Sequence, residues 1–418
     1  MERALRIALF SDSTHPIING VSISVDALVN ELRHQGHSVH IYANRFPGHQ
    51  DTDPNTFRFR AVEFPFWQGY PLLIPPVYHM LRQFRRHQYD VIHTHTPFLL
   101  GMVGLRWAES HEIPIVSTYH TLYDRYAHYV KCLPRRYVRY RIAKHTHFYY
   151  NRVNQVITPT DASQKWLIRH AVESPIHVIP TGSPRPKLTN RSEMRARLGM
   201  KPDQKILLYV GRLAHEKNLD MLLEGISMAM AADPQLRLWL VGDGPYRADC
   251  VIAARKLGIG DRVKFVGFVP REDVDSYYSA ADLFVFASET ETQGLVVQEA
   301  MLHGLPAVVV AGGGAGESIV SGENGFVTRN ESRDFSEKII KILQDDVEYA
   351  RVSEGAKRTA RSGTIDQMTQ QVLAVYRTAI ENYNPAPTEV SFPPSRSGEW
   401  TDDIEEHLSE TDTSQRVL

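Results

Sequence analysis

The chain has 418 residues, more than one compact core usually holds, which favours two or three domains. Hydrophobic residues make up 42% and charged residues 23%, which is ordinary for a soluble globular protein. The formal net charge of −1 hides an asymmetry, because residues 1–185 carry a net charge of +8 and residues 186–418 a net charge of −9. This split suggests that the basic first part faces an anionic partner.

Cysteine content and hydropathy exclude several classes of protein. Cys132 and Cys250 are the two cysteines, so a disulfide framework and a cysteine-based zinc site are excluded. The longest stretch of low charge, from Gly304 to Gly316, is too short and too rich in Gly and Pro to span a bilayer. The N-terminus lacks the pattern of a signal peptide. We therefore expect a cytoplasmic protein, either soluble or attached to a membrane surface.

The first part of the chain alternates short apolar runs with helical patterns. A helix is predicted from Val21 to Arg33, and Gly36 ends it. The predicted strands cover residues 5–10, 38–43, 90–93, 114–118 and 155–158. Strands and helices that alternate at this spacing form parallel βαβ units, so the sequence predicts an α/β doubly wound sheet within residues 1–182.

The pattern restarts after a Pro-, Gly- and Ser-rich break at residues 180–186, which we interpret as a linker. The predicted strands of this second α/β domain, residues 190–365, cover residues 206–210, 236–241, 263–267, 283–287 and 307–310. Residues 384–418 contain eight Asp or Glu and two Arg, and little that could build a core. We predict that they form a disordered acidic tail.

Two loops that follow predicted strands could bind phosphate, because ligands of open α/β sheets lie beyond the carboxyl ends of the strands. The loop from Ser11 to Val21 opens a helix, and Gly20 would let its backbone approach a ligand. The loop after Val210 carries Arg212 and Lys217, a pair of cations that suits a diphosphate. The alternatives are a βα loop without a ligand and a solvated charged loop.

Two further segments point to a sugar nucleotide. Residues 242–245 (Gly-Asp-Gly-Pro) predict a tight turn at which backbone could approach a ligand. Glu291 and Glu299 frame the start of a helix, where their carboxylates could accept hydrogen bonds from hydroxyl groups and the Gly294-Leu295 backbone offers N–H groups. The combination fits a sugar plus a ribose, and the alternative is two glutamates on a helix surface.

In this order, the Asn19-Gly20-Val21 loop, the Gly-Arg-Leu-x-x-Glu-Lys-Asn segment, the Gly-Asp-Gly-Pro turn and the Glu-x7-Glu motif resemble the retaining glycosyltransferase family 4. The resemblance covers roughly residues 5–383. It implies the GT-B fold, with two Rossmann-like domains, an active site in the cleft between them, and a last helix, residues 366–383, that crosses back onto the first domain.

The resemblance also implies roles for individual residues. Arg212 and Lys217 would hold the donor diphosphate, and Glu291 would contact the donor sugar. The other implied donor contacts are Gly20 and Val21 at a phosphate, Gly242 at the nucleotide, the backbone near Val266 at the base, the backbone of Gln293, Gly294 and Leu295 at the sugar, and Glu299 at the ribose.

Residues 117–129 resemble a segment of bacterial diacylglycerol glucosyltransferases, which transfer an α-glucosyl unit from UDP-glucose to the free hydroxyl of diacylglycerol. This likeness places His120 beside the donor sugar, as a catalytic residue together with Arg212, Lys217 and Glu291. Four residues would line the acceptor mouth: Tyr123, Tyr126, His128 and Tyr129. In the alternative, His120 stabilises a strand end and the aromatic residues belong to the core.

A basic and aromatic stretch predicts contact with a membrane. Residues 125–160 contain eight Lys or Arg and no Asp or Glu, with Tyr and Phe interleaved. Such a stretch suits an anionic bilayer, which we expect to meet residues 125–152 at the inner face of the plasma membrane, and residues 64–70 are a second candidate for this contact. A solvated helix is the alternative; RNA would also tolerate the stretch, but no nucleic-acid-binding module is visible.

Three metal-like patterns are interpreted as structural. His93 and His95 could ligate zinc, but no third ligand is evident. The Asp-x-Asp patterns at residues 51–53 and 273–275 do not follow strands, unlike the metal motif of the other glycosyltransferase fold. We therefore expect no cofactor and no essential divalent ion.

The sequence offers no clear carboxylate nucleophile for a double displacement, so we expect front-face attack with retention, in which the departing phosphate accepts the proton of the acceptor. Other family 4 reactions remain as alternatives: mannosyl- or sulfoquinovosyl-lipid synthesis, or transfer to a soluble sugar. A catalytically idle sugar-nucleotide-binding protein is a further alternative, which the intact Arg, Lys and Glu pair disfavours.

Overall fold

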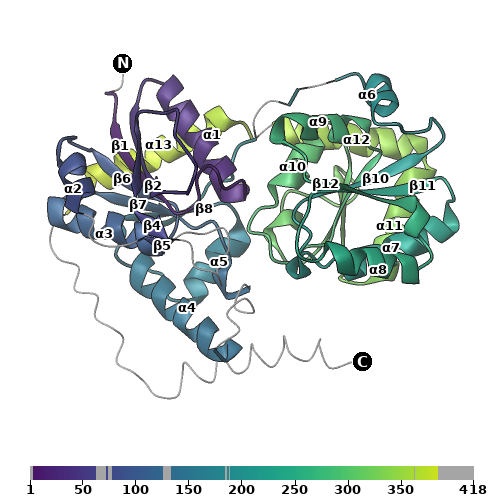
Figure 1. Cartoon of the computed structure of the whole chain (residues 1–418), viewed down its shortest axis with the longest axis horizontal. Helices are drawn as coiled ribbons and strands as arrows, with labels where there is room; N and C mark the ends of the chain where they lie inside the picture. The colour runs from purple at the N-terminus through teal and green to yellow at the C-terminus, as the bar shows by residue number, and fades with distance from the viewer. Residues whose placement is uncertain are drawn as a thin grey trace. The chain divides into compact units, whose positions relative to one another are not determined.

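The computed structural model describes residues 3–62, 72–73, 78–125, 133–183, 186–187, 189–361 and 363–384. Figure 1 labels many of the helices and strands within these ranges. The predicted interfacial segment at residues 64–70, the acceptor candidates Tyr126, His128 and Tyr129, and the predicted tail beyond Asn384 lie outside them.

The first domain is built on a seven-stranded parallel sheet with the order β3-β2-β1-β6-β7-β8-β9. The strands are β1 (Arg6–Ser11), β2 (Ser38–Asn44), β3 (Thr56–Phe59), β6 (Val91–Thr94), β7 (Ile115–Thr118), β8 (Gln155–Thr158) and β9 (Ile176–Val178). A small antiparallel pair is formed by β4 (Ala61–Val62) and β5 (Leu72–Leu73). The strand order reverses between β1 and β6, the kind of switch point at which ligands bind.

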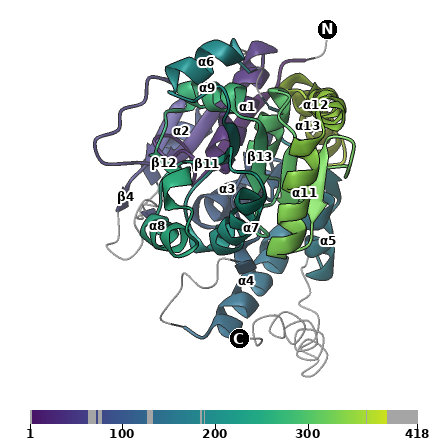
Figure 2. The ribbon, with the colours of Figure 1, turned by 90° about the vertical axis from the view of Figure 1, so that its right-hand side faces the viewer.

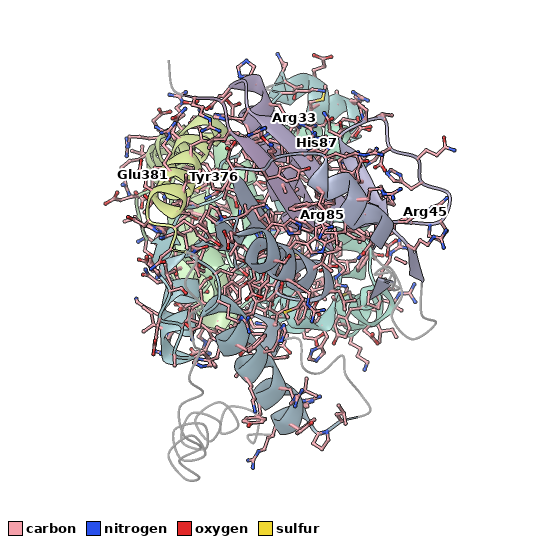
Figure 3. The ribbon with its side chains drawn as sticks, turned by 90° about the vertical axis from the view of Figure 1, so that its left-hand side faces the viewer. Arg33, Arg45, Arg85, His87, Tyr376 and Glu381 are labelled. Atoms are coloured by element: carbon pink, nitrogen blue, oxygen red, sulfur yellow. The ribbon has the colours of Figure 1, made fainter. Side chains whose placement is uncertain are left out.

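Helices cover both faces of this sheet. The cluster on one face unites α1 (Gly20–His34) with α13 (Ile365–Glu381), and its buried residues include Leu28, Val372 and Tyr376. The helix α13 follows the second domain in sequence, yet its apolar side completes the core of the first, with Tyr376 and Glu381 labelled on it in Figure 3. The other helices of this domain are α2 (Tyr78–Arg85), α3 (Leu99–His111), α4 (Arg135–Tyr150) and α5 (Asp161–Arg169).

The second domain contains a six-stranded parallel sheet with the order β12-β11-β10-β13-β14-β15. The strands are β10 (Lys205–Val210), β11 (Leu236–Val241), β12 (Val263–Gly267), β13 (Leu283–Phe286), β14 (Ala307–Val310) and β15 (Gly325–Thr328). All four residues of β13 and of β14 are buried, as in strands that helices cover on both faces. Here the order reverses between β10 and β13.

Helices also lie on both faces of the second sheet. Figure 2 shows α7 (Leu219–Ala232) beside α11 (Ser332–Gln344), and these two helices pack against each other. The remaining elements are α6 (Arg191–Arg197), η2 (His215–Lys217), α8 (Arg247–Lys256), η3 (Gly260–Arg262), α9 (Arg271–Ala280), α10 (Leu295–Leu302), η4 (Gly314–Gly316) and α12 (Asp346–Arg361). The two parallel sheets confirm the predicted α/β class with two Rossmann-like domains.

Three edge strands are absent from the sequence-based prediction. They are β3 and β9, at the two edges of the first sheet, and β15, at one edge of the second. Each has three or four residues, and all three residues of β9 are half-buried, so none forms a long apolar run. Within the described ranges, no helix is both long and apolar enough to cross a membrane.

Candidate functional site

Both predicted diphosphate ligands lie in the segment that leaves the carboxyl end of β10. This segment runs through Arg212 into η2, which ends at Lys217, and then into α7. The guanidinium of Arg212 pairs with Glu216, four residues further on, and the Lys217 ammonium pairs with Glu291 from the loop after β13. The structure therefore brings Lys217 and Glu291 into contact, whereas the Arg212 side chain stays 51% exposed.

The buried Tyr209 links these charged groups. Its hydroxyl donates to the carbonyl oxygen of Arg212 at 3.1 Å. Burial, together with the nearby carboxylates of Glu291 and Glu216, raises the pKa of Tyr209 well above its usual value. A neutral hydroxyl thus holds the Arg212 backbone at the end of β10, close to two carboxylates.

The loop that carries Glu291 is fixed by close packing. Gly294 has a φ of 75°, and a Cβ there would come within 2.7 Å of Ala315. The carbonyl oxygen of Glu291 accepts from the N–H of Gly314 at 2.7 Å. The side chain of Gln293 hydrogen-bonds to the backbone of Thr181 at 3.0 and 3.1 Å. The position of the Glu291 carboxylate is therefore set by its neighbours on both sides.

The helices α1 and α10 begin differently. Asn19 caps α1, and its side-chain oxygen accepts from the N–H of Val21 at 2.9 Å. Val21, a predicted phosphate contact, thus already has a partner for its N–H. No side-chain hydrogen bond caps α10 at Gly294, the residue before Leu295. A Cβ on Gly20 would lie 3.9 Å from Leu295, so these two predicted donor contacts lie close together.

The predicted nucleotide turn requires glycine. Gly242 has a φ of 129°, and a Cβ there would lie 2.0 Å from the carbonyl oxygen of Gly211. Its N–H donates to the carbonyl oxygen of Gly267 at 2.8 Å. The turn after β11 is thereby joined to the end of β12, where Val266 is half-buried.

Glu299, the predicted ribose ligand, is buried in α10 and already has two partners. Its carboxylate pairs with Arg271 at 2.8 Å and accepts from the Tyr278 hydroxyl at 2.9 Å. Burial raises the pKa of Glu299, and the positive charge of Arg271 opposes this change. Each carboxylate oxygen can accept more than one hydrogen bond, so capacity for a hydroxyl remains.

In the first domain, His120 lies just beyond β7. Its Nε2 is 2.8 Å from Nδ1 of His95, and burial lowers the pKa of His120 to about 4, so the ring is neutral near pH 7. Tyr123, the described acceptor candidate, packs edge-on against Phe98 with ring centroids 4.7 Å apart, and it also contacts Tyr119. Tyr123 is therefore part of an aromatic cluster, and its own side chain is half-buried.

The described residues contain no group of three or more His, Cys, Asp or Glu that could hold a metal ion. The ring of His93 hydrogen-bonds to Thr118 at 2.8 Å and to Tyr376 at 2.7 Å. These contacts give His93 a structural role between β6, β7 and α13.

Carboxylates of both Asp-x-Asp patterns bind other groups of the protein. Asp51 pairs with Arg58, and Asp53 pairs with Arg33. Asp275 lies in α9, as predicted for a helix, and accepts from a backbone N–H at 2.9 Å.

Three partners of the site residues were not predicted from the sequence. They are Glu216, Arg271, and His95 in its contact with His120. Arg212 and Glu216 share the short segment between β10 and α7, so their closeness in the sequence is a signal that was available. The contact between Arg271 and Glu299 has no local signal, because strand order brings α9 and α10 together.

Family models match most of the chain. A model described as Glycosyltransferase Family 4 matches residues 18–183, and one described as Glycosyl transferases group 1 matches residues 190–359. The two matched ranges contain the two parallel sheets, apart from β1.

Known proteins are similar along much of their length. An alpha-monoglucosyldiacylglycerol synthase of Streptococcus pneumoniae is 32% identical over 320 residues, which cover 73% of this chain and 70% of that protein. The enzyme of the same description from Acholeplasma laidlawii is 29% identical over 401 residues, covering 91% and 98%. The structure of Anabaena HepE in complex with UDP has the same fold, with a TM-score of 0.72 at 22% identity and coverages of 90% and 100%. The chain therefore belongs to glycosyltransferase family 4, and it is a hexosyltransferase.

Proposed function

We propose that this enzyme transfers glucose from UDP-glucose to the free hydroxyl of diacylglycerol at a membrane surface, with retention of the anomeric configuration. The two relatives described as alpha-monoglucosyldiacylglycerol synthases support this donor sugar and acceptor. The observation that carries the proposal is the placement of Arg212 and Lys217 together at the carboxyl end of β10, beside the loop of Glu291.

The proposed chemistry begins with the leaving group. UDP gains negative charge as the glycosidic bond breaks, and the cations of Arg212 and Lys217 stabilise that charge. The start of α10, which no side chain caps at Gly294, adds backbone N–H groups and the positive end of a helix dipole. The Arg212 side chain is half-exposed, so a diphosphate can approach its guanidinium while the pair with Glu216 remains.

The attack on the anomeric carbon takes place on the front face in this proposal. A double displacement needs a carboxylate free to act as nucleophile, but Glu291 pairs with Lys217 and Glu299 with Arg271. The departing phosphate oxygen therefore accepts the proton of the acceptor hydroxyl. Glu291 and the neutral His120 bind hydroxyls of the donor sugar, and Glu299 binds the ribose.

The helix α4 provides a surface for the membrane. Arg136, Tyr137, Tyr140, Arg141 and Lys144 are exposed, and at about 100° per residue they lie within one face of the helix. The side chains buried on the opposite side are Val138, Thr146, Tyr149 and Tyr150. We define the five exposed residues as the α4 face. Its positive charge and its amphipathic tyrosines complement anionic headgroups, so it would hold the enzyme where diacylglycerol resides.

The donor and acceptor are tested by a panel of nucleotide sugars with vesicles that contain diacylglycerol. We expect UDP-glucose to be consumed, the lipid to gain one hexose, and NMR of the product to report an α-linkage. UDP-galactose, GDP-mannose and UDP-sulfoquinovose are the competing donors, and a soluble sugar is the competing acceptor. Consumption of another donor, or a β-linked product, would contradict the proposal.

Membrane attachment is tested separately by co-sedimentation with anionic and neutral vesicles. Changing Arg136, Arg141 and Lys144 to Gln should weaken binding to anionic vesicles by about 100-fold, since each cation contributes about 1 kcal/mol. A matched control changes three exposed cations of the second domain, Lys201, Arg255 and Lys256, to Gln. Equal losses in both triple variants would reject a specific role for the α4 face.

A further inference from the structure

The ring of His120 hydrogen-bonds to another histidine. Its Nε2 lies 2.8 Å from Nδ1 of His95, and the two rings stack with centroids 5.1 Å apart and an angle of 20° between their planes. His95 is 1% exposed. The second ring nitrogen of His95, Nε2, is buried and has no hydrogen-bond partner among the described residues.

The ring of His95 also packs against the ring of His93. The two centroids are 4.1 Å apart. His93 is itself fixed, because one ring nitrogen bonds to Thr118 on β7 and the other bonds to Tyr376 on α13. His95 therefore contacts an anchored ring as well as the ring of His120, and these two contacts restrict its orientation.

The number of protons on the His95–His120 pair follows from burial. Burial lowers the pKa of His95 well below its ordinary value and that of His120 to about 4, so both rings are neutral at pH 7. A neutral imidazole has one N–H and one lone pair. Either Nδ1 of His95 donates to Nε2 of His120, or the bond runs in the opposite direction.

The unpartnered nitrogen of His95 distinguishes the two directions. If His120 donated, the proton of His95 would be on Nε2, as a buried N–H without an acceptor. Buried N–H groups without partners are rarer in proteins than buried acceptors with spare capacity. If His95 donates through Nδ1, its Nε2 carries only a lone pair. The second arrangement is therefore favoured, and it leaves the proton of His120 on Nδ1.

We infer that His95 is a positioning residue, which holds His120 in the tautomer with its proton on Nδ1 and so presents His120 as a hydrogen-bond donor rather than as a base. The statement that His120 donates a hydrogen bond to an oxygen of the donor sugar rests on the proposed function. The tautomer itself is a property of the free protein and can be measured without a ligand.

The tautomer is read from the protein labelled with ¹⁵N in its histidines, by two-bond ¹H–¹⁵N correlation at pH 7. His120 is assigned as the signal that His120→Gln removes. We expect a protonated Nδ1 and an unprotonated Nε2 for His120. His95→Leu replaces the ring with an apolar side chain that has no hydrogen-bond donor. In this variant we expect His120 to shift toward the tautomer protonated on Nε2. His95→Asn places an amide N–H near the position of Nδ1 and should restore the wild-type pattern.

Kinetics then separate positioning from packing. In His95→Leu we expect kcat to fall about 10- to 100-fold with little change in KM for the donor, the pattern of a bond that strengthens in the transition state. His95→Asn should recover most of this loss. As a matched control, Tyr376→Phe removes a partner of His93 and leaves the His95–His120 bond, so the tautomer of His120 should not change.

Each outcome is decisive for one claim. A wild-type His120 protonated on Nε2, or a tautomer that is the same in His95→Leu, overturns the inference. If His95→Leu does not fold, the wild-type and His95→Asn spectra still show which ring nitrogen of His120 carries the proton. If the tautomer follows residue 95 as expected but kcat does not change, the positioning role stands and the proposed role of His120 in transfer fails.

Discussion

At the end of β10, Arg212 and Lys217 each pair with a carboxylate, whereas at the ends of β6 and β7 the ionisable groups are neutral histidines. Burial lowers the pKa of His93 to about 3 and that of His120 to about 4. The carboxyl end of β10 thus presents charged groups, and we call it the charged edge. The carboxyl ends of β6 and β7 present uncharged hydrogen-bonding groups, and we call them the neutral edge. The difference supports a division of labour in which the second domain holds the anionic part of the donor and the first domain contacts hydroxyls.

The helix starts differ in the same sense. Asn19 closes the start of α1 with two backbone N–H groups as donors, but Gly294 opens α10 without a side-chain cap. A helix start without a side-chain cap is better suited to bind an anion, because its N–H groups are not satisfied by the helix itself. The four predictions that follow test this contrast between the charged edge and the neutral edge.

The largest effect is expected for Arg212→Ala. Removal of a cation that stabilises the leaving group should lower kcat by about 100- to 1,000-fold, similar to the loss of one donor from an oxyanion hole. Because Arg212 pairs with the buried carboxylate of Glu216, the thermal unfolding midpoint should also fall, so kcat is measured at a temperature at which the variant is folded. Arg351→Ala is a control for the loss of a half-exposed cation: Arg351 lies on α12 and pairs with Glu348. Near-wild-type kcat in Arg212→Ala would contradict the charged edge as the diphosphate site.

A smaller effect, on stability, is expected for Arg271→Ala. This change leaves the buried carboxylate of Glu299 without its cation, and we expect the free energy of unfolding to fall by about 1–3 kcal/mol. Chemical denaturation measures this loss. Glu299→Gln removes the charge, so the double variant should be more stable than the sum of the two single changes predicts. Strict additivity would show that the pair is not coupled.

The neutral edge predicts a dependence of stability on pH. The unfolded chain binds a proton at each histidine near the ordinary pKa of 6.5, but folded His93 binds one only at about 3. The contribution of His93 to the free energy of unfolding is therefore fully present above pH 6.5, and it is lost as the pH is lowered toward 4. In His93→Gln the slope of unfolding free energy against pH should be smaller by about 1.4 kcal/mol per pH unit. An unchanged slope between pH 6 and 4 would mean that folded His93 titrates normally.

The smallest effect is expected for Asn19→Ala, which removes the cap of α1. Loss of an N-cap costs about 1 kcal/mol of unfolding free energy, which denaturation can detect. Asn190, the cap of the short helix α6, gives a comparison in the second domain, since its side chain also accepts from a backbone N–H. If Asn19→Ala raised KM for the donor far more than Asn190→Ala did, the start of α1 would have a role in binding as well.

The sequence predicted the central strands because each is a short apolar run that helices cover on both faces. β10 and β11, for example, lie within one residue of their predicted bounds. The edge strands β3, β9 and β15 gave no comparable signal because each has only three or four residues and forms no long apolar run, whereas β12, also at an edge, has five residues and was predicted. The helix α1 was predicted from its apolar positions at helical spacing, whereas α13 was expected from the family resemblance.

The candidate site was predicted in its local parts and not in its pairings. Arg212 and Lys217 share one loop, so their proximity follows from the sequence alone. The contacts of Lys217 with Glu291 and of His95 with His120 depend on which strands are neighbours. The order β10-β13 and the order β6-β7 create these contacts, and neither order has a local sequence signature.

The position of α13 has a consequence for biosynthesis. Its residues Val372 and Tyr376 are buried in the same cluster as Ile7 and Leu28, near the start of the chain. During translation, the first domain emerges from the ribosome long before this last helix does. The part of this sheet face that α13 covers beside α1 therefore stays exposed until the second domain has been made. The nascent chain needs protection from aggregation during that time, and nonsense truncations just before α13 would expose that apolar surface permanently.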